Sequence, residues 1–174
     1  PLLGGAPAVW NTCLVFYQVA LLAGYLYAHL ASTRLRPRQQ VILHAVLLAT
    51  AALLLPIAVR GGTPPASANP IGWVFRLLLV SLGLPFFVLS TTGPLLQRWF
   101  ASLPRERAGD PYALFAASNV GSFLALLGYP FLIEPALALR TQALAWTAGY
   151  GVFAVLMLLA GRSVWTVRAD APAQ

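Results

Sequence analysis

The side chains that could do chemistry in this chain are polar residues inside long apolar stretches. Asn11 and Gln18 are seven residues apart, so two helical turns place them on one face. The other candidates are the amides and hydroxyls Ser90, Thr91, Thr92, Gln97, Asn119 and Ser122. Such groups need hydrogen-bond partners in hydrocarbon, so they should face a bundle interior. There they either join neighbouring helices, which is the interpretation we favour, or line a polar cavity.

Three prolines interrupt the same apolar stretches. Pro94 has no N–H to bond the carbonyl of Ser90, and Pro85 frees a carbonyl in the same way. We expect helix kinks at Pro85, Pro94 and Pro130, with hydroxyls or water covering the freed carbonyls. Broken helices can mark binding sites in secondary transporters, and they also occur as plain kinks, which we favour for each one alone.

No catalytic or metal-binding motif accompanies these residues. The sequence has no glycine-rich phosphate loop with lysine, no G-x-S-x-G turn and no paired metal ligands. We therefore assign no catalytic residue and no metal site. His29 and His44 lie near the ends of consecutive stretches and could approach each other, although we favour interfacial anchors over a proton or metal role. Cys13, the only cysteine, is expected to be a small buried apolar residue.

Five apolar stretches of about 20 residues must position these side chains, and that length spans a bilayer core of ~30 Å as a helix. The chain is 59% hydrophobic and 9% charged, with a mean hydropathy of +0.77. A soluble domain has about 25% charged residues. We predict an all-α, polytopic membrane helical bundle with about five transmembrane helices and short loops. In one domain of residues 1–174, the helices cover about 9–32, 40–59, 71–99, 112–133 and 143–162.

All eleven Lys-or-Arg positions are arginine, and they are concentrated in alternate connections between the predicted helices. The net charge is +7, and eight of the eleven arginines lie in the first connection, the third connection and the tail. The positive-inside rule places the loops Arg34–Arg38 and Arg105–Arg107 and the C-terminal tail in the cytoplasm, with Pro1 on the outer side. Because orientation explains this charge, we expect no nucleic-acid partner.

Tryptophans mark the ends of the predicted helices. Trp10, Trp73 and Trp146 fall at outer ends, and Trp99 and Trp165 fall at inner ends. Indole rings prefer the headgroup level, so the tryptophans and the arginines indicate the same topology.

Small residues recur every fourth position in two stretches, and such ridges let helices approach closely. We expect the first and fourth helices to be interior packing elements through Ala20, Gly24, Ala28, Ala117, Gly121 and Ala125. Since the connections are short, we also expect sequential helices to pack as antiparallel neighbours.

Several segments together resemble one family. They are residues 1–18, 84–99, 110–112, 117–122 and 129–135, in matching order along the chain. In these segments the chain resembles the membrane region of bacterial fused proteins with an MFS-like transporter part and a spermidine-synthase part. The resemblance places the chain in the bacterial inner membrane.

The resemblance also implies a partner domain. In a full-length relative, a cytoplasmic aminopropyltransferase-like domain with a Rossmann-type fold would follow and use decarboxylated S-adenosylmethionine. No feature of that domain occurs in these residues, so we expect a fragment of a longer chain with no cofactor of its own. The expected partners are the lipid bilayer, the downstream synthase-like domain and a small amine ligand.

Three functions are open at this point. The chain could anchor a spermidine-synthase-like domain and pass or sense a small amine. It could instead be part of an MFS-like secondary transporter for a small solute, or a purely structural anchor. The lack of any acid within the predicted helices argues against a site for a polycation, because a buried cation needs compensating negative charge.

Overall fold

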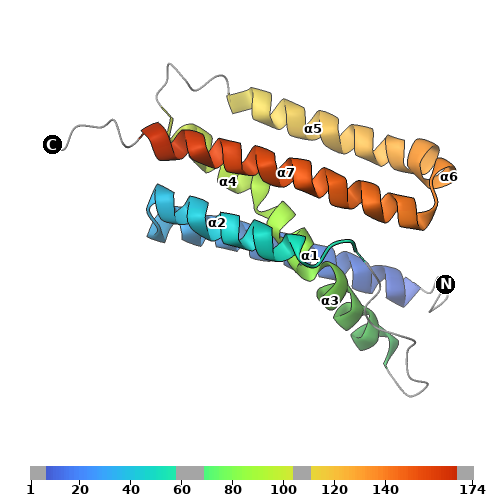
Figure 1. Cartoon of the computed structure of the whole chain (residues 1–174). Helices are drawn as coiled ribbons and strands as arrows, with labels where there is room; N and C mark the ends of the chain where they lie inside the picture. The colour runs from blue at the N-terminus through green and yellow to red at the C-terminus, as the bar shows by residue number, and fades with distance from the viewer. Residues whose placement is uncertain (1–6, 58–68, 104–110, 168–174) are drawn as a thin grey trace.

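The computed structural model describes residues 7–57, 69–103 and 111–167, and these residues form an all-helical bundle (Figure 1). The helices run back and forth between two ends of the molecule. Their bounds are α1 Pro7–Arg34, α2 Pro37–Ala52, α3 Pro70–Ser90, α4 Thr92–Ala101, α5 Pro111–Gly128, the π-helix η1 Tyr129–Ile133, α6 Glu134–Ala136 and α7 Leu139–Val167. The predicted all-α class is therefore confirmed.

Four helical segments among the described residues are long and apolar enough to cross a membrane. They are Pro7–Arg34, Pro70–Ala101, Tyr112–Ala136 and Leu139–Trp165, with mean hydropathies from 1.4 to 2.0. Their outward side chains are apolar, such as Leu22, which is 69% exposed, and Val152, which is 62% exposed. Apolar surface on this scale indicates that the protein is embedded in a membrane.

The predicted count of about five transmembrane helices is not confirmed. The second helix, α2, has 16 residues, or about 24 Å of helix, which is shorter than a bilayer core of ~30 Å. It ends at Ala52 because Pro56, four residues later, has no N–H to bond the Ala52 carbonyl. The end expected at residue 59 lies outside the described residues.

Helix α1 packs mainly against α3 rather than against α2. Gly24 makes this contact close, since a Cβ built on it would lie 3.0 Å from the backbone carbonyl carbon of Ser90. The Ser90 hydroxyl donates to the Ala20 carbonyl at 3.2 Å. Gly24 and Ala28 are buried, so the interior role predicted for the first ridge is confirmed. Helix α1 does contact α2, as predicted for sequential helices, but this contact is much smaller than the one with α3.

The small residues Ala117, Gly121 and Ala125 in the fourth apolar stretch are not buried. Helix α5 lies along the outside of the bundle, beyond α7 (Figure 1). A Cβ built on Gly121 would meet no atom within 4 Å, and Ala117 and Ala125 are exposed. The interior role predicted for this helix is therefore wrong for the described residues. Small residues allow a close approach but do not determine which helix approaches.

The expected helix over 71–99 is divided at Thr91. Helix α3 ends at Ser90 and α4 begins at Thr92, so the break falls where Pro94 leaves the Ser90 carbonyl without its helical donor. Pro85, in contrast, lies buried inside a continuous α3.

Pro130 falls in a segment with a wider turn. It lies in η1, where the Glu134 N–H donates to the Tyr129 carbonyl five residues earlier. A proline ring clashes with the carbonyl four residues before it, and the wide turn contains that carbonyl for Pro135 of α6, namely the carbonyl of Phe131. Of the three prolines at which we expected kinks, Pro94 follows a break between two helices and Pro130 lies in a π-helix. At Pro85 the helix is not interrupted.

The core lies where α2, α4 and α7 meet. Leu48 of α2, Leu95 of α4 and Met157 of α7 belong to one buried cluster. The Tyr150 hydroxyl of α7 donates to the Leu48 carbonyl at 3.2 Å. Trp99 of α4 and Val164 of α7 belong to the same cluster, so the core extends to the end of the bundle where α4 and α7 finish.

Candidate functional site

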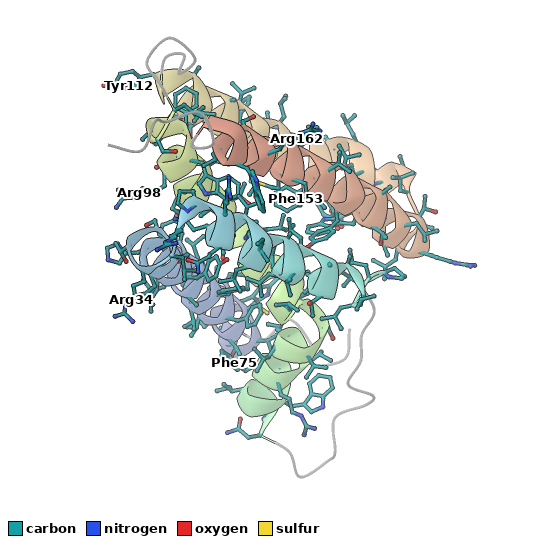
Figure 2. The ribbon with its side chains drawn as sticks, turned by 60° about the vertical axis from the view of Figure 1, so that its left-hand side comes forward. Arg34, Phe75, Arg98, Tyr112, Phe153 and Arg162 are labelled. Atoms are coloured by element: carbon teal, nitrogen blue, oxygen red, sulfur yellow. The ribbon has the colours of Figure 1, made fainter. Side chains whose placement is uncertain are left out.

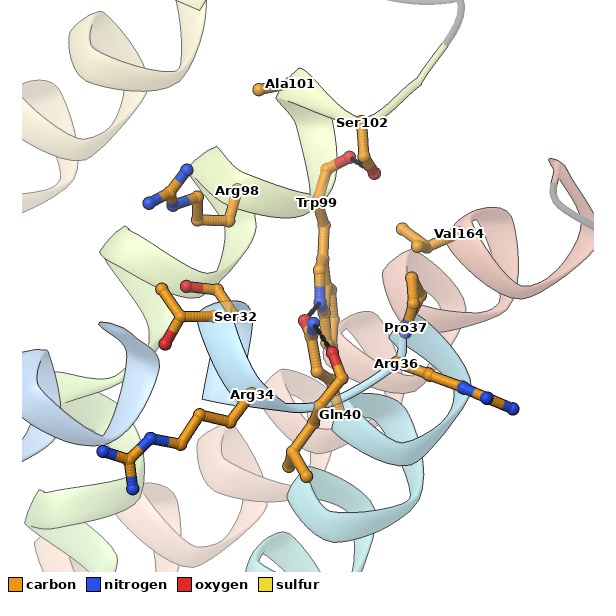
Figure 3. Close-up of a pocket in the computed structure, with 12 residues that line it drawn as sticks. Ser32, Arg34, Arg36, Pro37, Gln40, Arg98, Trp99, Ala101, Ser102 and Val164 are labelled. Atoms are coloured by element: carbon orange, nitrogen blue, oxygen red, sulfur yellow. Dashed lines mark hydrogen bonds between the residues drawn. The ribbon is translucent and has the colours of Figure 1, made fainter. Parts of the chain in front are cut away.

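A hollow of about 650 Å³ opens at one end of the bundle, where α1 ends, α2 begins and α4 ends (Figure 3). Its lining includes three arginines, Arg34, Arg36 and Arg98. Ser32 and Ser102 add hydroxyl groups. We name this space the arginine hollow.

The floor of the arginine hollow is fixed by two hydrogen bonds. The Trp99 indole N–H donates to Gln40 Oε1 at 3.0 Å, and Gln40 Nε2 donates to the Leu35 carbonyl at 2.9 Å. Trp99 is only 4% exposed, so it is an interior residue and not the headgroup anchor predicted from the sequence. Gly161 of α7 borders the ring, since a Cβ there would lie at the ordinary contact distance of 3.6 Å from Trp99 Cη2.

The arginines surround this floor from different helices. Arg34 is the last residue of α1, Arg36 caps the start of α2, and Arg98 lies in α4. In Figure 3 the side chains of Arg34 and Arg98 extend to one side, with Ser32 between them, while Arg36 extends to the other. Figure 2 also shows Arg34 and Arg98 on one side of the molecule.

Charge at this end is strongly positive. The first turn of α2 adds the positive end of its helix dipole, with Pro37 at the first position. Arg38 stacks on Trp165, with its guanidinium carbon 5.4 Å from the ring centroid, and so ties α2 to α7. Among the described residues the only acid is Glu134, which begins α6 at the opposite end of the bundle (Figure 1).

A smaller hollow of about 230 Å³ adjoins the first and shares Ser32 and Arg98 with it. His29 and Gln97 line this second space. Gln97 is therefore the predicted cavity residue that the structure brings to the arginine-rich end.

Two hydroxyl groups at the helix break, those of Ser90 and Thr91, donate hydrogen bonds to backbone carbonyls. Ser90 donates to the Phe87 carbonyl at 2.7 Å as well as to Ala20, and Thr91 donates to the Val88 carbonyl at 2.6 Å. The Thr92 hydroxyl is buried without a hydrogen-bond partner in the structure. Only the bond from Ser90 to Ala20 joins two helices, as the favoured interpretation expects, and the other two bonds are local.

The remaining predicted cavity residues lie on exposed helix faces. Asn11 and Gln18 are exposed on α1, and Asn119 and Ser122 are exposed on α5. Helix α1 buries a different face, which includes Phe16. The structure therefore does not bring the eight predicted residues together in one polar cavity.

The two histidines have separate environments. His44 is 1% exposed, and its ring centroid lies 6.2 Å from those of Tyr27 and Trp99. His29 is exposed, and no group of three potential metal ligands occurs in the part of the chain that the structure describes. Cys13 is half-buried rather than buried.

The sequence interpretation missed the arginine hollow. It used the arginines only to orient the helices, and it did not single out Gln40. The available signal was the placement of polar residues 32–40 and 97–102 at the same end of the predicted bundle.

Comparison of the chain with models of protein families, with curated proteins and with solved structures finds no match. The functional proposals below therefore depend on the geometry of the described residues and on the resemblance noted in the sequence.

Proposed function

We propose that the chain is a membrane domain that crosses the bilayer five times and anchors a cytoplasmic domain, with the arginine hollow at the cytoplasmic surface. The observation that carries this proposal is the uneven charge of the two ends. Five described arginines lie where α1, α4 and α7 end and α2 begins, whereas Arg76 and Arg140 lie toward the other end (Figure 1). Positive charge of this kind is retained on the cytoplasmic side.

The fifth crossing would use α2 and the residues after it. Helix α2 starts at the arginine-rich end, and α3 starts at the opposite end (Figure 1). Leu53 to Ile57 continue the apolar sequence beyond α2, and Leu53 is 82% exposed. Leu53 to Leu55 continue in turns that hydrogen-bond back to α2. At a helical rise of about 1.5 Å per residue, five residues add about 8 Å to the ~24 Å of α2, which is enough to complete ~30 Å.

Anchoring agrees with the position of the last helix. Helix α7 ends at Val167, at the arginine-rich end, so the chain leaves the bundle on the proposed cytoplasmic side (Figure 1). A synthase-like domain, which the sequence resemblance implies, would follow there. Three arginines around the hollow repel a polycationic amine, so we propose anchoring rather than passage of an amine.

The transporter alternative has less support. The break between α3 and α4 could mark a solute path, but the Ser90 and Thr91 hydroxyls bond backbone carbonyls and Gly24 packs directly against Ser90. A plain structural break explains these contacts.

Cysteine labelling in cells tests the topology. In a Cys13→Ala background, single cysteines would replace Thr33, Gly72 and Leu139, which are exposed at the two ends. With a membrane-impermeant maleimide, we expect positions 72 and 139 to react from outside and position 33 only after lysis. Labelling of positions 33 and 72 from the same side would refute the crossing by α2.

A second experiment tests the anchoring. The reading frame downstream of Gln174 should encode a Rossmann-type synthase-like domain, and that domain should sediment with membranes. A frame that ends without such a domain would remove the basis for the anchoring function and leave only the membrane topology.

A further inference from the structure

Anchoring does not explain why two arginines from different helices line one hollow. Arg34 and Arg98 come from different helices, line the same hollow and extend to the same side of it, with Ser32 between them (Figure 3). Interfacial arginines that only orient a helix need not line a shared space, because each can reach the headgroups independently.

The positive charge of the hollow lacks a counter-charge among the described residues. Their only acid, Glu134, lies at the other end of the bundle, and Arg38 is directed to Trp165 instead. The start of α2 contributes its helix dipole to the same space. An anion would therefore relieve the mutual repulsion of the arginines.

The side chains that line the site suit a phosphate group. Guanidinium groups bind phosphate oxygens through paired, charge-assisted hydrogen bonds. The Trp99–Gln40–Leu35 hydrogen bonds keep the floor in place without a ligand, so little ordering is needed on binding. A volume of about 650 Å³ falls within the usual range of small-molecule sites.

We infer that the arginine hollow binds a phosphate group through Arg34 and Arg98, carried either by the headgroup of an anionic phospholipid or by a soluble phosphate ester. The lipid source rests on the proposed function, because it requires this end of the bundle to lie at the membrane surface. The soluble source requires only that the hollow is open to water.

Native mass spectrometry of the purified full chain in a neutral detergent tests this inference. The probes are phosphatidylglycerol, phosphatidylcholine and, as a competitor, glycerol phosphate. The test variant is Arg34→Gln/Arg98→Gln, and the matched control is Arg76→Gln/Arg140→Gln, which removes the same charge at the other end. We expect the test pair to weaken phosphatidylglycerol binding at least about tenfold and the control pair less than about twofold.

A second variant separates geometry from charge. Arg34→Lys/Arg98→Lys keeps both charges but loses the planar pairing with phosphate, so we expect a loss of about threefold or more. Far-UV circular dichroism confirms that each variant is folded. Equal weakening by the Arg34/Arg98 and Arg76/Arg140 pairs, or full binding by the test pair, would overturn the inference.

Competition identifies the source of the phosphate. Displacement of phosphatidylglycerol by millimolar glycerol phosphate supports a soluble ester, and resistance to it supports the lipid headgroup. Cysteine labelling is independent of both results. If position 33 reacts from outside the cell while the Arg34/Arg98 pair still controls binding, the proposed topology fails and the phosphate site stands.

Discussion

Replacement of Gly24 by alanine tests the closest helix contact in the molecule. A Cβ at this position would overlap the Ser90 hydroxyl and would lie 2.9 Å from Ser90 Cβ and 3.0 Å from the Ser90 carbonyl carbon. The last of these atoms belongs to the backbone, so a side-chain rotation cannot remove the clash. Helices α1 and α3 must move apart.

The expected cost follows from three contributions. Overpacking of a close contact costs about 1–3 kcal/mol. Separation of the helices also breaks the hydrogen bond from Ser90 to the Ala20 carbonyl, which contributes about 0.6 kcal/mol in a membrane protein. Alanine gains about 1 kcal/mol over glycine in helix propensity. We therefore expect Gly24→Ala to lower the free energy of unfolding by roughly 1–2 kcal/mol.

The measurement is equilibrium unfolding in mixed micelles with increasing dodecyl sulfate, followed by circular dichroism. Gly121→Ala is the matched control, since a Cβ there meets no atom within 4 Å. It should leave stability unchanged or raise it. Replacing Ser90 by glycine in the Gly24→Ala background should recover part of the loss. If Gly24→Ala is as stable as Gly121→Ala, α1 and α3 do not pack as described.

Two further substitutions test the floor of the arginine hollow by the same unfolding measurement. Trp99→Phe removes the indole N–H and leaves the buried oxygen of Gln40 without its donor, so stability should fall by about 1–3 kcal/mol; an unchanged midpoint would show that this hydrogen bond does not form. Gly161→Val should lower stability by at least about 1 kcal/mol because even a Cβ would lie 3.0 Å from Val41 Cγ1. Gly149→Val is its control, with open space around it, and equal effects at the two glycines would contradict the packing of α7 on α2.

The helical class could be predicted because apolar length and the absence of charge are local properties of the chain. The short α2 could also have been expected, since Pro56 lies within the apolar stretch and cannot continue a helix. The outer position of α5 could not, because its ridge of small residues closely resembles the ridge of α1 around Gly24. Only the tertiary arrangement distinguishes the two.

The positions of the polar residues were likewise only partly predictable from the sequence. Their spacing correctly places Asn11 and Gln18 on one face of a helix. It does not determine which face turns inward, because α1 is apolar on every side and has no single face that must be buried. The arginine hollow depends on contacts between residues about 60 positions apart, such as Gln40 and Trp99, and no local pattern encodes these.

The π-helix at Tyr129–Ile133 has a consequence for the far end of the molecule. A π turn accommodates one more residue than an α turn, so it offsets every later side chain by about 100° around the helix axis. In this register the Tyr129 hydroxyl donates to Gln142 Oε1 at 3.3 Å, and Gln142 Nε2 donates to the Leu137 carbonyl at 2.9 Å. The π turn thus fixes the direction in which α6 and the chain after it leave α5, and the Tyr129–Gln142 hydrogen bond joins that turn to the start of α7.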